Sequence, residues 1–596
     1  MNKGIFSFLM LACSLFPAQQ KPVQIAFLSD VHFQDLYGSF SDQGFKGITN
    51  PKTGKPTILR TMDSQLHSTR IFNENYFAFL KALDDIAAKG ITIVAMPGDF
   101  SDDGQAYNIR GLHRILDQYY KKYGINFYLT TGNHDPVGPF RQEAGKDDFL
   151  GEDGNPLGIY SREYRGKANR KIITGDIAES GYLEILHELK DFGFYPKKEN
   201  LFWSTPFSSG SVENYSYEQA LANAGYDKRK YEVTKGFYVP DLSYVVEPVK
   251  GVWLLAIDGN IYIPKNLSEN PGNPSNYKGA GIGYNNVLTH KKHLIDWVKR
   301  ITSEAKRNGK TVIAFTHYPM IDFNDGATGE IKKLLGGKKW QLERVPDEEV
   351  AQAFAEAGLA VHFAGHMHIN DTGIKKFKEK MLVNIQVPSL AAYLPAYKIL
   401  TIQSPDRMEV TTEVLHDVPN FNELFPLYEK EYQALQKDKT KILWNKDILK
   451  TKSYRDFMLF HLKELVRLRM IPDDWPEDFI KKAGKISGEE LLLLVQTKAQ
   501  LKEKGIDAKA FRRWNVEDLL LDLYKFQSAD ELAKNDIPKE RRKQYRLLEE
   551  VYANSRAEDP FIVQLKSVFK IFSQLSSGDP ADHFEIDLEK QEIRRL

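Results

Sequence analysis

The sequence predicts an α/β fold followed by an all-α domain, and three observations support this prediction. Short apolar runs alternate with amphipathic helical segments up to about residue 400, which is typical of a largely parallel sheet with helices on its faces. Between about residues 136 and 250 this alternation breaks down in a stretch rich in Gly, Tyr, Lys and Asn, which indicates a large insertion. From residue 425 to residue 596 amphipathic helical segments dominate, which indicates a separate α-helical domain.

The periodicity of apolar residues predicts four helices in the first part of the chain and six in the last part. The predicted ranges are 72–88, 112–123, 290–306 and 348–357, then 428–443, 454–470, 488–502, 516–526, 539–554 and 561–575. A further short helix is expected inside the insertion, at residues 181–189.

The charge balance of the chain is close to neutral. Among 596 residues, Lys and Arg number 81 and Asp and Glu number 80, so the formal net charge is +1. Nothing in this balance indicates a polyanion-binding surface, and the sequence contains no evidence for a nucleic-acid partner. The hydrophobic content of 42% is ordinary for a soluble globular protein.

Residues 1–18 have the layout of a secretory signal peptide. Lys3 supplies a positive start, residues 5–15 form an apolar core, and Pro17-Ala18 precedes a polar stretch. The alternative is an ordinary buried N-terminal helix. We expect export to the periplasm or the extracellular space. No other apolar run is long enough to cross a membrane, so no transmembrane segment is expected.

Cys13 is the only cysteine, so cleavage after Ala18 would leave a mature chain without a disulfide. The run Met10-Leu11-Ala12-Cys13 also resembles a bacterial lipoprotein cleavage box, which would place a lipid anchor on Cys13. Met10 replaces the usual Leu of that box, and apolar residues follow the cysteine where a polar tether is expected. These departures favour plain secretion and leave the lipoprotein as the alternative.

Three predicted strands in the first part of the chain end in side chains that can bind metal ions. Asp30 and His32 follow the strand at residues 23–28, Asp99 follows residues 91–96, and Asn133 follows residues 125–131. Residues two apart in an extended segment point the same way, so Asp30 and His32 can reach one ion. The two carboxylate oxygens of Asp99 can bridge two ions. Ligands bind at this edge in open α/β sheets.

Two later strands end in histidines. His317 follows the strand at residues 311–315, and His366 and His368 follow the strand at residues 360–364 with the spacing of Asp30 and His32. A lone histidine at a strand end is more often structural than a ligand. Five strands that all end in ligand-type residues instead predict a site for two ions with mixed oxygen and nitrogen ligation.

At these positions the sequence resembles the calcineurin-like metallophosphoesterase superfamily. The matching blocks, in family order, are Asp30-Val31-His32, Gly98-Asp99-Phe100-Ser101-Asp102, Gly132-Asn133-His134-Asp135, His317 and Gly365-His366-Met367-His368. The resemblance covers roughly residues 22–400 and predicts a domain of residues 19–424 that contains the insertion. It implies a β-sandwich flanked by helices, with two metal ions at the strand ends.

The resemblance also implies a role for each site residue. One ion would be held by Asp30, His32 and His368, the other by Asn133, His317 and His366, with Asp99 bridging them. His134 would be the general acid, and Asp102 and Asp135 would orient imidazoles. The ligand types suit Mn, Fe or Zn. Purple acid phosphatases have a Tyr ligand at the position of Asp102, so a tyrosinate–iron(III) site is not expected.

The predicted function is therefore that of a secreted phosphoesterase with two divalent metal ions and a phosphate-ester substrate. The metal blocks contain no Arg, and the first nearby ones, Arg110 and Arg141, lie in flanking segments. Fewer fixed cations favour a phosphodiester, with its single charge, over a phosphomonoester, which is the alternative. A binding protein of the same fold without turnover is a further alternative. The insertion is expected either to line the substrate pocket or to serve as a structural cover.

Overall fold

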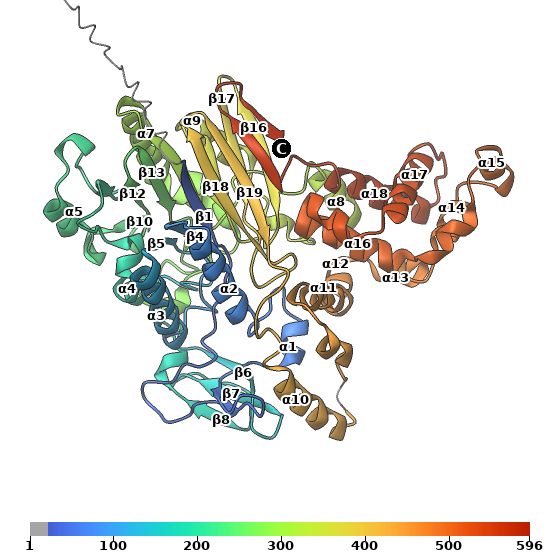
Figure 1. Cartoon of the computed structure of the whole chain (residues 1–596), viewed down its shortest axis with the longest axis horizontal. Helices are drawn as coiled ribbons and strands as arrows, with labels where there is room; N and C mark the ends of the chain where they lie inside the picture. The colour runs from blue at the N-terminus through green and yellow to red at the C-terminus, as the bar shows by residue number, and fades with distance from the viewer. Residues whose placement is uncertain (1–21, 441) are drawn as a thin grey trace, which may run out of the picture.

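The fold is a sandwich of two seven-stranded sheets, described by a computed structural model over residues 22–440 and 442–596 (Figure 1). The ring of Phe27 in the first sheet stacks on that of Phe363 in the second, with their centroids 3.6 Å apart. The predicted β-sandwich is thus confirmed. The predicted signal peptide and Cys13 lie outside the described residues.

The first sheet joins the amino-terminal strands to strands from the end of the chain. In spatial order its strands are β21 (Glu592–Arg595), β20 (His583–Asp587), β19 (Arg407–Val414), β18 (Ala396–Ser404), β1 (Val23–Phe27), β4 (Ile93–Pro97) and β5 (Asn126–Thr130). Strands β1, β4 and β5 are parallel, and their carboxyl ends therefore meet at one edge.

In the second sheet, too, the strands that precede predicted ligands are parallel neighbours. Its order is β16 (Asp371–Phe377), β17 (Lys380–Gln386), β15 (Val361–Ala364), β14 (Thr311–Thr316), β13 (Val252–Ile257), β12 (Tyr244–Val249) and β9 (Phe202–Ser204). Strands β13, β14, β15 and β17 are parallel. The predicted parallel α/β layout is present, and antiparallel strands extend both sheets.

The predicted helices of the first part are present with small changes in length. They are α2 (Asn75–Ala88), α3 (Ala106–Tyr123), α7 (Lys292–Arg307) and α9 (Glu348–Glu356). Shorter elements around them are β2 (Ile48–Thr49), β3 (Pro56–Thr57), α1 (Met62–Leu66), α6 (Val287–His290) and α8 (Thr328–Leu335). Helix α3 starts earlier than predicted because buried Tyr107 and Ile109 extend its apolar face.

The insertion contains more regular structure than the sequence indicates. Its elements are the small sheet β6 (Gly145–Leu150), β7 (Pro156–Tyr160) and β8 (Lys171–Ile173), helices α4 (Tyr182–Glu188) and α5 (Tyr217–Asn223), and the hairpin β10 (Lys230–Thr234) with β11 (Phe237–Pro240). Strands β9 and β12 pair with each other and belong to the second sheet. The insertion therefore returns to the sandwich before residue 250.

The helical carboxyl-terminal region is present, with one correction. Its helices are α10 (Phe425–Lys437), α11 (Tyr454–Leu465), the π-helical turn Val466–Met470, α12 (Ile471–Asp474), α13 (Glu477–Ala483), α14 (Gly488–Leu493), α15 (Lys498–Glu503), α16 (Val516–Ala529), α17 (Lys539–Ala553) and α18 (Pro560–Leu575). The prediction of an all-α region up to residue 596 is wrong at its end. The last two strands pair with β19 because their alternating residues Phe584 and Ile586 are buried there.

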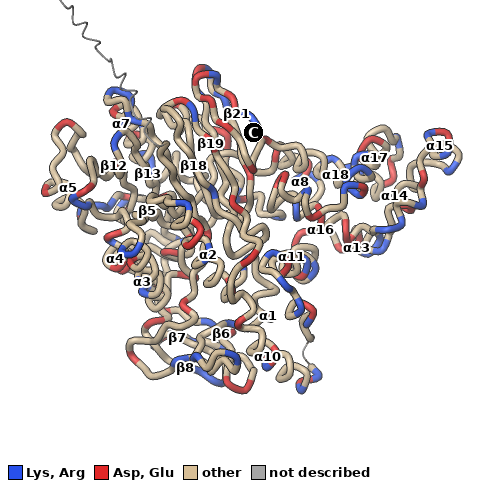
Figure 2. The backbone as a smooth tube through the Cα atoms, viewed as in Figure 1, with Lys and Arg blue, Asp and Glu red and all other residues tan. Residues whose placement is uncertain are grey.

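Helices α13–α18 extend to the right of the sandwich in Figure 1, and the sheet β6–β8 lies below it. Blue basic and red acidic segments are interspersed along the tube in Figure 2, in line with the net charge of +1. Among the described residues, no helix combines the length and the apolar character needed to cross a membrane.

Two contacts tie the start of the helical region to the sandwich. Tyr428 and Phe457 are fully buried in the same hydrophobic core as the two sheets. The hydroxyl of Tyr428 donates a hydrogen bond of 2.6 Å to the buried carboxyl of Glu74. The chain later returns to the first sheet through β20, so both ends of the helical region pack on the sandwich.

Candidate metal centre

The predicted ligands lie together between the carboxyl edges of the two sheets, on turns that directly follow parallel strands. Six residues of these turns have left-handed backbone conformations, with φ between +44° and +74°: Asp30, His32, Asp99, Asp103, His366 and His368. Residues other than glycine adopt such conformations at a cost, and they cluster at functional sites where the surroundings hold them. The backbone is thus bent to aim these side chains at one place.

The first group of ligands consists of Asp30, His32 and His368. The Nε2 atoms of His32 and His368 lie 3.0 Å apart, and an Oδ1 atom of Asp30 lies 3.4 Å from Nε2 of His368. Each of the three residues offers one ligand atom, and these atoms lie within 4.8 Å of one another. Asp30 and His32 are completely buried.

The second group consists of Asp99, Asn133, His317 and His366. Its common point is Nε2 of His317, which lies 3.1 Å from Oδ1 of Asn133, 3.1 Å from Nδ1 of His366 and 3.2 Å from Oδ2 of Asp99. The same Oδ2 atom of Asp99 lies 3.9 Å from Nε2 of His32 in the first group. Asp99 therefore faces both groups, as expected of a bridging ligand.

These distances fit a cation in each group. Ligand atoms at about 2.1 Å from a shared metal ion lie about 3.0–3.4 Å from one another in octahedral or tetrahedral arrangements. The outer nitrogens of two imidazoles are also occupied: His317 donates from Nδ1 to the carbonyl of Pro97 at 3.0 Å, and His366 donates from Nε2 to the carbonyl of Gly281 at 2.9 Å. This leaves Nε2 of His317 and Nδ1 of His366 free for a metal.

One histidine of each group, His32 and His366, favours the neutral form that binds metals, whereas the burial of His317 is outweighed by the charge of Asp99, which raises the pKa of His317. Burial, reinforced by the positive charge of Arg70, lowers the pKa of His32 well below its usual value. Burial together with the charge of Arg344 does the same for the pKa of His366. A neutral imidazole offers its lone pair to a cation without first losing a proton.

Two glycines give the ligands the room they need. A Cβ on Gly132 would lie 2.1 Å from Oδ1 of Asp99, and one on Gly365 would lie 2.4 Å from Oδ2 of Asp30. Only glycine allows the backbone to pass so close to these carboxylates.

His134 lies beside the metal ligands and outside both groups. Its backbone N–H donates to Oδ1 of Asp99 at 2.8 Å, and its Nε2 is 4.0 Å from Oδ2 of the same residue. Its Nδ1 contacts the carboxylate of Asp103, which Lys146 contacts from the other side. Burial acts to raise the pKa of Asp103, but the charges of Lys146 and His134 outweigh it and hold that pKa well below its usual value. Asp103 thus orients the His134 ring as a charged carboxylate.

Asp102 and Asp135 do not occupy the imidazole-orienting positions that the sequence suggests. Asp102 accepts hydrogen bonds from Arg60 at 3.2 Å and from Arg70 at 2.9 Å. Asp135 accepts one from the backbone N–H of Ser101, and its other oxygen has no hydrogen-bond partner in the described structure. Burial and the nearby charge of Asp99 raise the pKa of Asp135. Asp102 and Asp135 therefore hold loops of the site in place. The carboxylate that contacts the His134 imidazole belongs to Asp103, which the sequence analysis did not identify.

A cavity of about 240 Å³ opens onto the ligands. It is lined by Ser68, Thr69, Arg70, Asp99, Asn133, His134, Gln341, Arg344, His366, Met367, His368 and Arg469. Three arginines line it, although the sequence blocks contain none. Arg110 and Arg141 instead pair with Asp176 and Glu143. Within the described structure, the lining contains no residue of the insertion, although Lys146 of the insertion contacts Asp103 beside the site.

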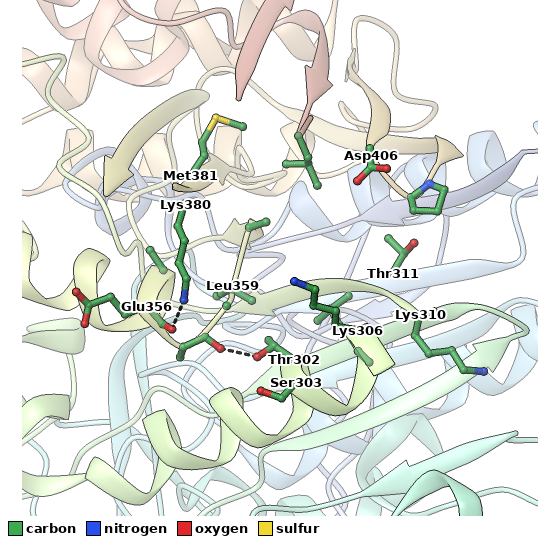
Figure 3. Close-up of a pocket in the computed structure, with 18 of the residues that line it drawn as sticks. Thr302, Ser303, Lys306, Lys310, Thr311, Glu356, Leu359, Lys380, Met381 and Asp406 are labelled. Carbon is green, nitrogen blue, oxygen red and sulfur yellow. Dashed lines mark hydrogen bonds between the residues drawn. The ribbon is translucent and has the colours of Figure 1, made fainter. Parts of the chain in front are cut away.

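A larger cavity of about 560 Å³ lies at the opposite edge of the second sheet. It is bounded by Thr311 and Met381, at the amino-terminal ends of β14 and β17, and several lysines surround it (Figure 3). Figure 3 shows the side chains of Thr302 and Lys380 donating hydrogen bonds to the backbone carbonyls of Ala357 and Glu356. Its described lining contains no histidine, so it does not share the chemistry of the metal centre.

Comparisons with known proteins agree with this geometry. Residues 23–205 match the family model described as calcineurin-like phosphoesterase. No curated protein sequence matches the chain.

Two solved structures resemble the chain at 10% sequence identity. One is a dimetal phosphatase from Danio rerio, with a TM-score of 0.33 over 66% of this chain and 97% of that one. The other is a purple acid phosphatase from yellow lupin (Lupinus luteus) seeds, with a TM-score of 0.30 over 67% of this chain and 52% of that one. Similarities of this size carry no argument about this chain.

Proposed function

We propose that this chain, which carries a calcineurin-like metallophosphoesterase domain and is a metal-dependent phosphoric ester hydrolase, acts on phosphate monoesters. The observation that carries the proposal is that Arg70 and Arg344 line the cavity that opens onto the metal ligands. A monoester carries up to two charges and gains more from fixed cations than a diester with one. The preference for diesters drawn from the sequence rested on the lack of such cations, and the fold supplies them.

The residues that would hold two ions are Asp30, His32 and His368 for one, and Asn133, His317 and His366 for the other, with Asp99 shared. When bound, two divalent ions polarise phosphoryl oxygens, acidify water and offset the charge that develops in the reaction. Nitrogen and oxygen donors without thiolate suit Mn, Fe or Zn.

His134 is proposed to give a proton to the leaving group. Its Nδ1 contacts Asp103, so its Nε2 faces the cavity that the ligands line. A carboxylate on Nδ1 fixes the tautomer that carries its second proton on Nε2 when the ring is charged. General acid catalysis of this kind contributes about 10²–10⁴-fold to the rate.

Arg70 and Arg344 are proposed to bind the oxygens of the phosphoryl group. Nη2 of Arg70 is held 2.9 Å from Asp102 and lies 3.5 Å from Nδ1 of His134. Arg344 has no carboxylate within ion-pair distance in the described part of the chain, although it lines the cavity with His366. A guanidinium without a fixed partner in such a cavity is available to an anionic substrate.

The test compares p-nitrophenyl phosphate with bis-p-nitrophenyl phosphate on metal-loaded protein. We expect kcat/KM for the monoester to exceed that for the diester by more than about tenfold, which is about 1.4 kcal/mol. A diester preference of the same size would return the assignment to a phosphodiesterase. A binding protein without turnover would release no nitrophenolate from either compound after Mn²⁺ addition.

We also propose that the chain is exported after cleavage near Ala18. The layout of residues 1–18 supports this, and a lipid anchor on Cys13 is the alternative. N-terminal sequencing of the protein from its native host is expected to find a start near Gln19. Retention of Met1 would refute export, and a lipid-modified Cys13 would place the protein on a membrane surface.

A further inference from the structure

Arg469 reaches the metal cavity from the helical carboxyl-terminal region. It lies on the π-helical turn Val466–Met470 and lines the cavity that also contains His134 and His368. Its Nη1 donates to the carbonyl of His67 at 3.2 Å, and its Nε lies 3.6 Å from Oδ2 of Asp473. These contacts hold one side of the guanidinium. Its side chain is 47% exposed, which places it on the solvent side of the cavity.

Arg344 lines the same cavity as Arg469 and the ligand His366. It ends the 3₁₀ turn Leu342–Arg344, and its charge acts on His366. Burial lowers the pKa of Arg344, the charge of Asp99 opposes this, and the positive charge of Arg469 adds to the lowering. Two guanidinium groups therefore face the same cavity close enough to repel each other, and within the described structure no carboxylate is ion-paired with Arg344. An anion bound between them would relieve that repulsion.

We infer that Arg469 forms a second anion subsite and shares Arg344 with the subsite of the scissile phosphoryl group, so that the preferred substrate carries a second phosphate beyond the one that is hydrolysed. The inference rests on the proposed monoesterase function of the same site. The scissile phosphate occupies the metal side of the cavity, near Arg70 and His134. The second phosphate lies toward the outer side, where planar guanidinium groups match its oxygens in pairs.

The matched substrates for the test are propane-1,3-diol monophosphate and propane-1,3-diol bisphosphate, which differ only by the second phosphate. After division by two for its two equivalent ends, kcat/KM for the bisphosphate is expected to be at least tenfold higher. Arg469→Ala is expected to lower kcat/KM for the bisphosphate by about tenfold, with a much smaller loss for the monophosphate. Arg469→Lys keeps the charge without the paired donors, so its kcat/KM for the bisphosphate is expected to lie between those of the wild type and of Arg469→Ala.

Arg467→Ala is the matched control. Arg467 lies on the same turn but pairs with Glu464 and does not line the cavity. This variant is expected to keep the wild-type preference for the bisphosphate. Thermal melting of all variants checks that each remains folded.

A binding measurement separates failure of the subsite from failure of the monoesterase proposal. Calorimetry on metal-loaded protein compares methylphosphonate with methylenebisphosphonate, and only the latter is expected to bind at least about fivefold more weakly to the Arg469→Ala protein. Equal losses for both ligands, or equal kcat/KM for the two esters in the wild type, would overturn the subsite and leave the monoesterase assignment intact. If neither ester is hydrolysed, the monoesterase proposal fails and the binding result alone decides on the subsite.

Discussion

The Nε2 atom of His32 lies 3.0 Å from the Nε2 atom of His368, although the two residues are 336 positions apart. His32 is fully buried, and its pKa is lowered by burial and by Arg70, so its ring is held in the neutral form. The approach is the one expected of two imidazoles whose lone pairs bind the same divalent cation, with Asp30 as a further ligand.

Replacement of the shared ligand is the first test of this interpretation. Asp99→Asn removes the charge of a residue that faces both ligand groups, and the protein is expected to bind fewer than one ion per chain on average, against two in the wild type. Elemental analysis after dialysis against buffer with Mn²⁺ measures this. His113→Gln changes a histidine that pairs with Glu188 away from the site and serves as the control. Two retained ions in the Asp99 variant would argue against a bridging role.

The contact between Asp103 and His134 leads to a second prediction. Asp103→Asn is expected to keep both metals and to lower kcat by about 10²-fold for substrates with poor leaving groups, because the imidazole loses the charge that stabilises its protonated form. His134→Ala is expected to show the same pattern with a larger loss. In both variants the loss should shrink for nitrophenolate, which needs no proton. Equal losses for good and poor leaving groups would contradict the general-acid assignment.

The metal ligands could be predicted from the sequence, but the carboxylate that orients His134 could not, and the reasons are physical. Each ligand follows a buried β-prone run, and the carboxyl ends of parallel strands meet by necessity. The choice between Asp102 and Asp103 depends on a local backbone turn, since Asp103 has a φ of +58° that rotates its side chain toward His134. Two adjacent carboxylates in a loop give no pattern from which that turn could be predicted.

The arginines of the cavity could not be predicted for a different reason. Arg344 and Arg469 lie on short 3₁₀ and π turns, and their approach to the ligands depends on how the helical region packs against the sandwich. Similarly, the strand His583–Asp587 is too short to stand out after a long helical stretch, and only its pairing with β19 establishes it as a strand. Long-range packing leaves no local signature in such segments.

A third prediction concerns Glu74, whose carboxyl is fully buried. Burial raises its pKa to about 7 despite the hydrogen bond from Tyr428, and its Oε2 has no hydrogen-bond partner in the described structure. Because the folded pKa lies above the unfolded value, the stability from Glu74 is complete below pH 4.5 and is lost as the pH rises through 7. The free energy of unfolding should therefore fall between pH 5 and pH 8.

The Glu74→Gln variant isolates this contribution. Glutamine resembles the protonated carboxyl and does not titrate, so the wild type should lose about 2–3 kcal/mol more stability than the variant between pH 5 and pH 8. Urea unfolding at the two pH values, with both proteins in the same metal state, measures the difference. Parallel pH profiles would show that Glu74 is charged throughout this range.

The fourth prediction concerns the independence of the sandwich. Truncation after residue 424 removes buried Tyr428 and Phe457 from the shared core and deletes strands β20 and β21 from the first sheet. We expect the truncated protein to be insoluble or to melt far below the full chain, because an apolar face and a sheet edge become exposed. A soluble truncated protein with an unchanged melting temperature would show that residues 19–424 fold on their own.

The most direct test of the proposed metal-dependent phosphatase activity is a titration of chelator-stripped protein with Mn²⁺, followed by phosphate release from p-nitrophenyl phosphate. Activity is expected to be lost on stripping and to return to a plateau at two equivalents of metal per chain. Parallel titrations with Zn²⁺ and Fe²⁺ rank the three metals that suit the donor set. Full activity in the stripped protein, or none at any metal concentration, would contradict the assignment.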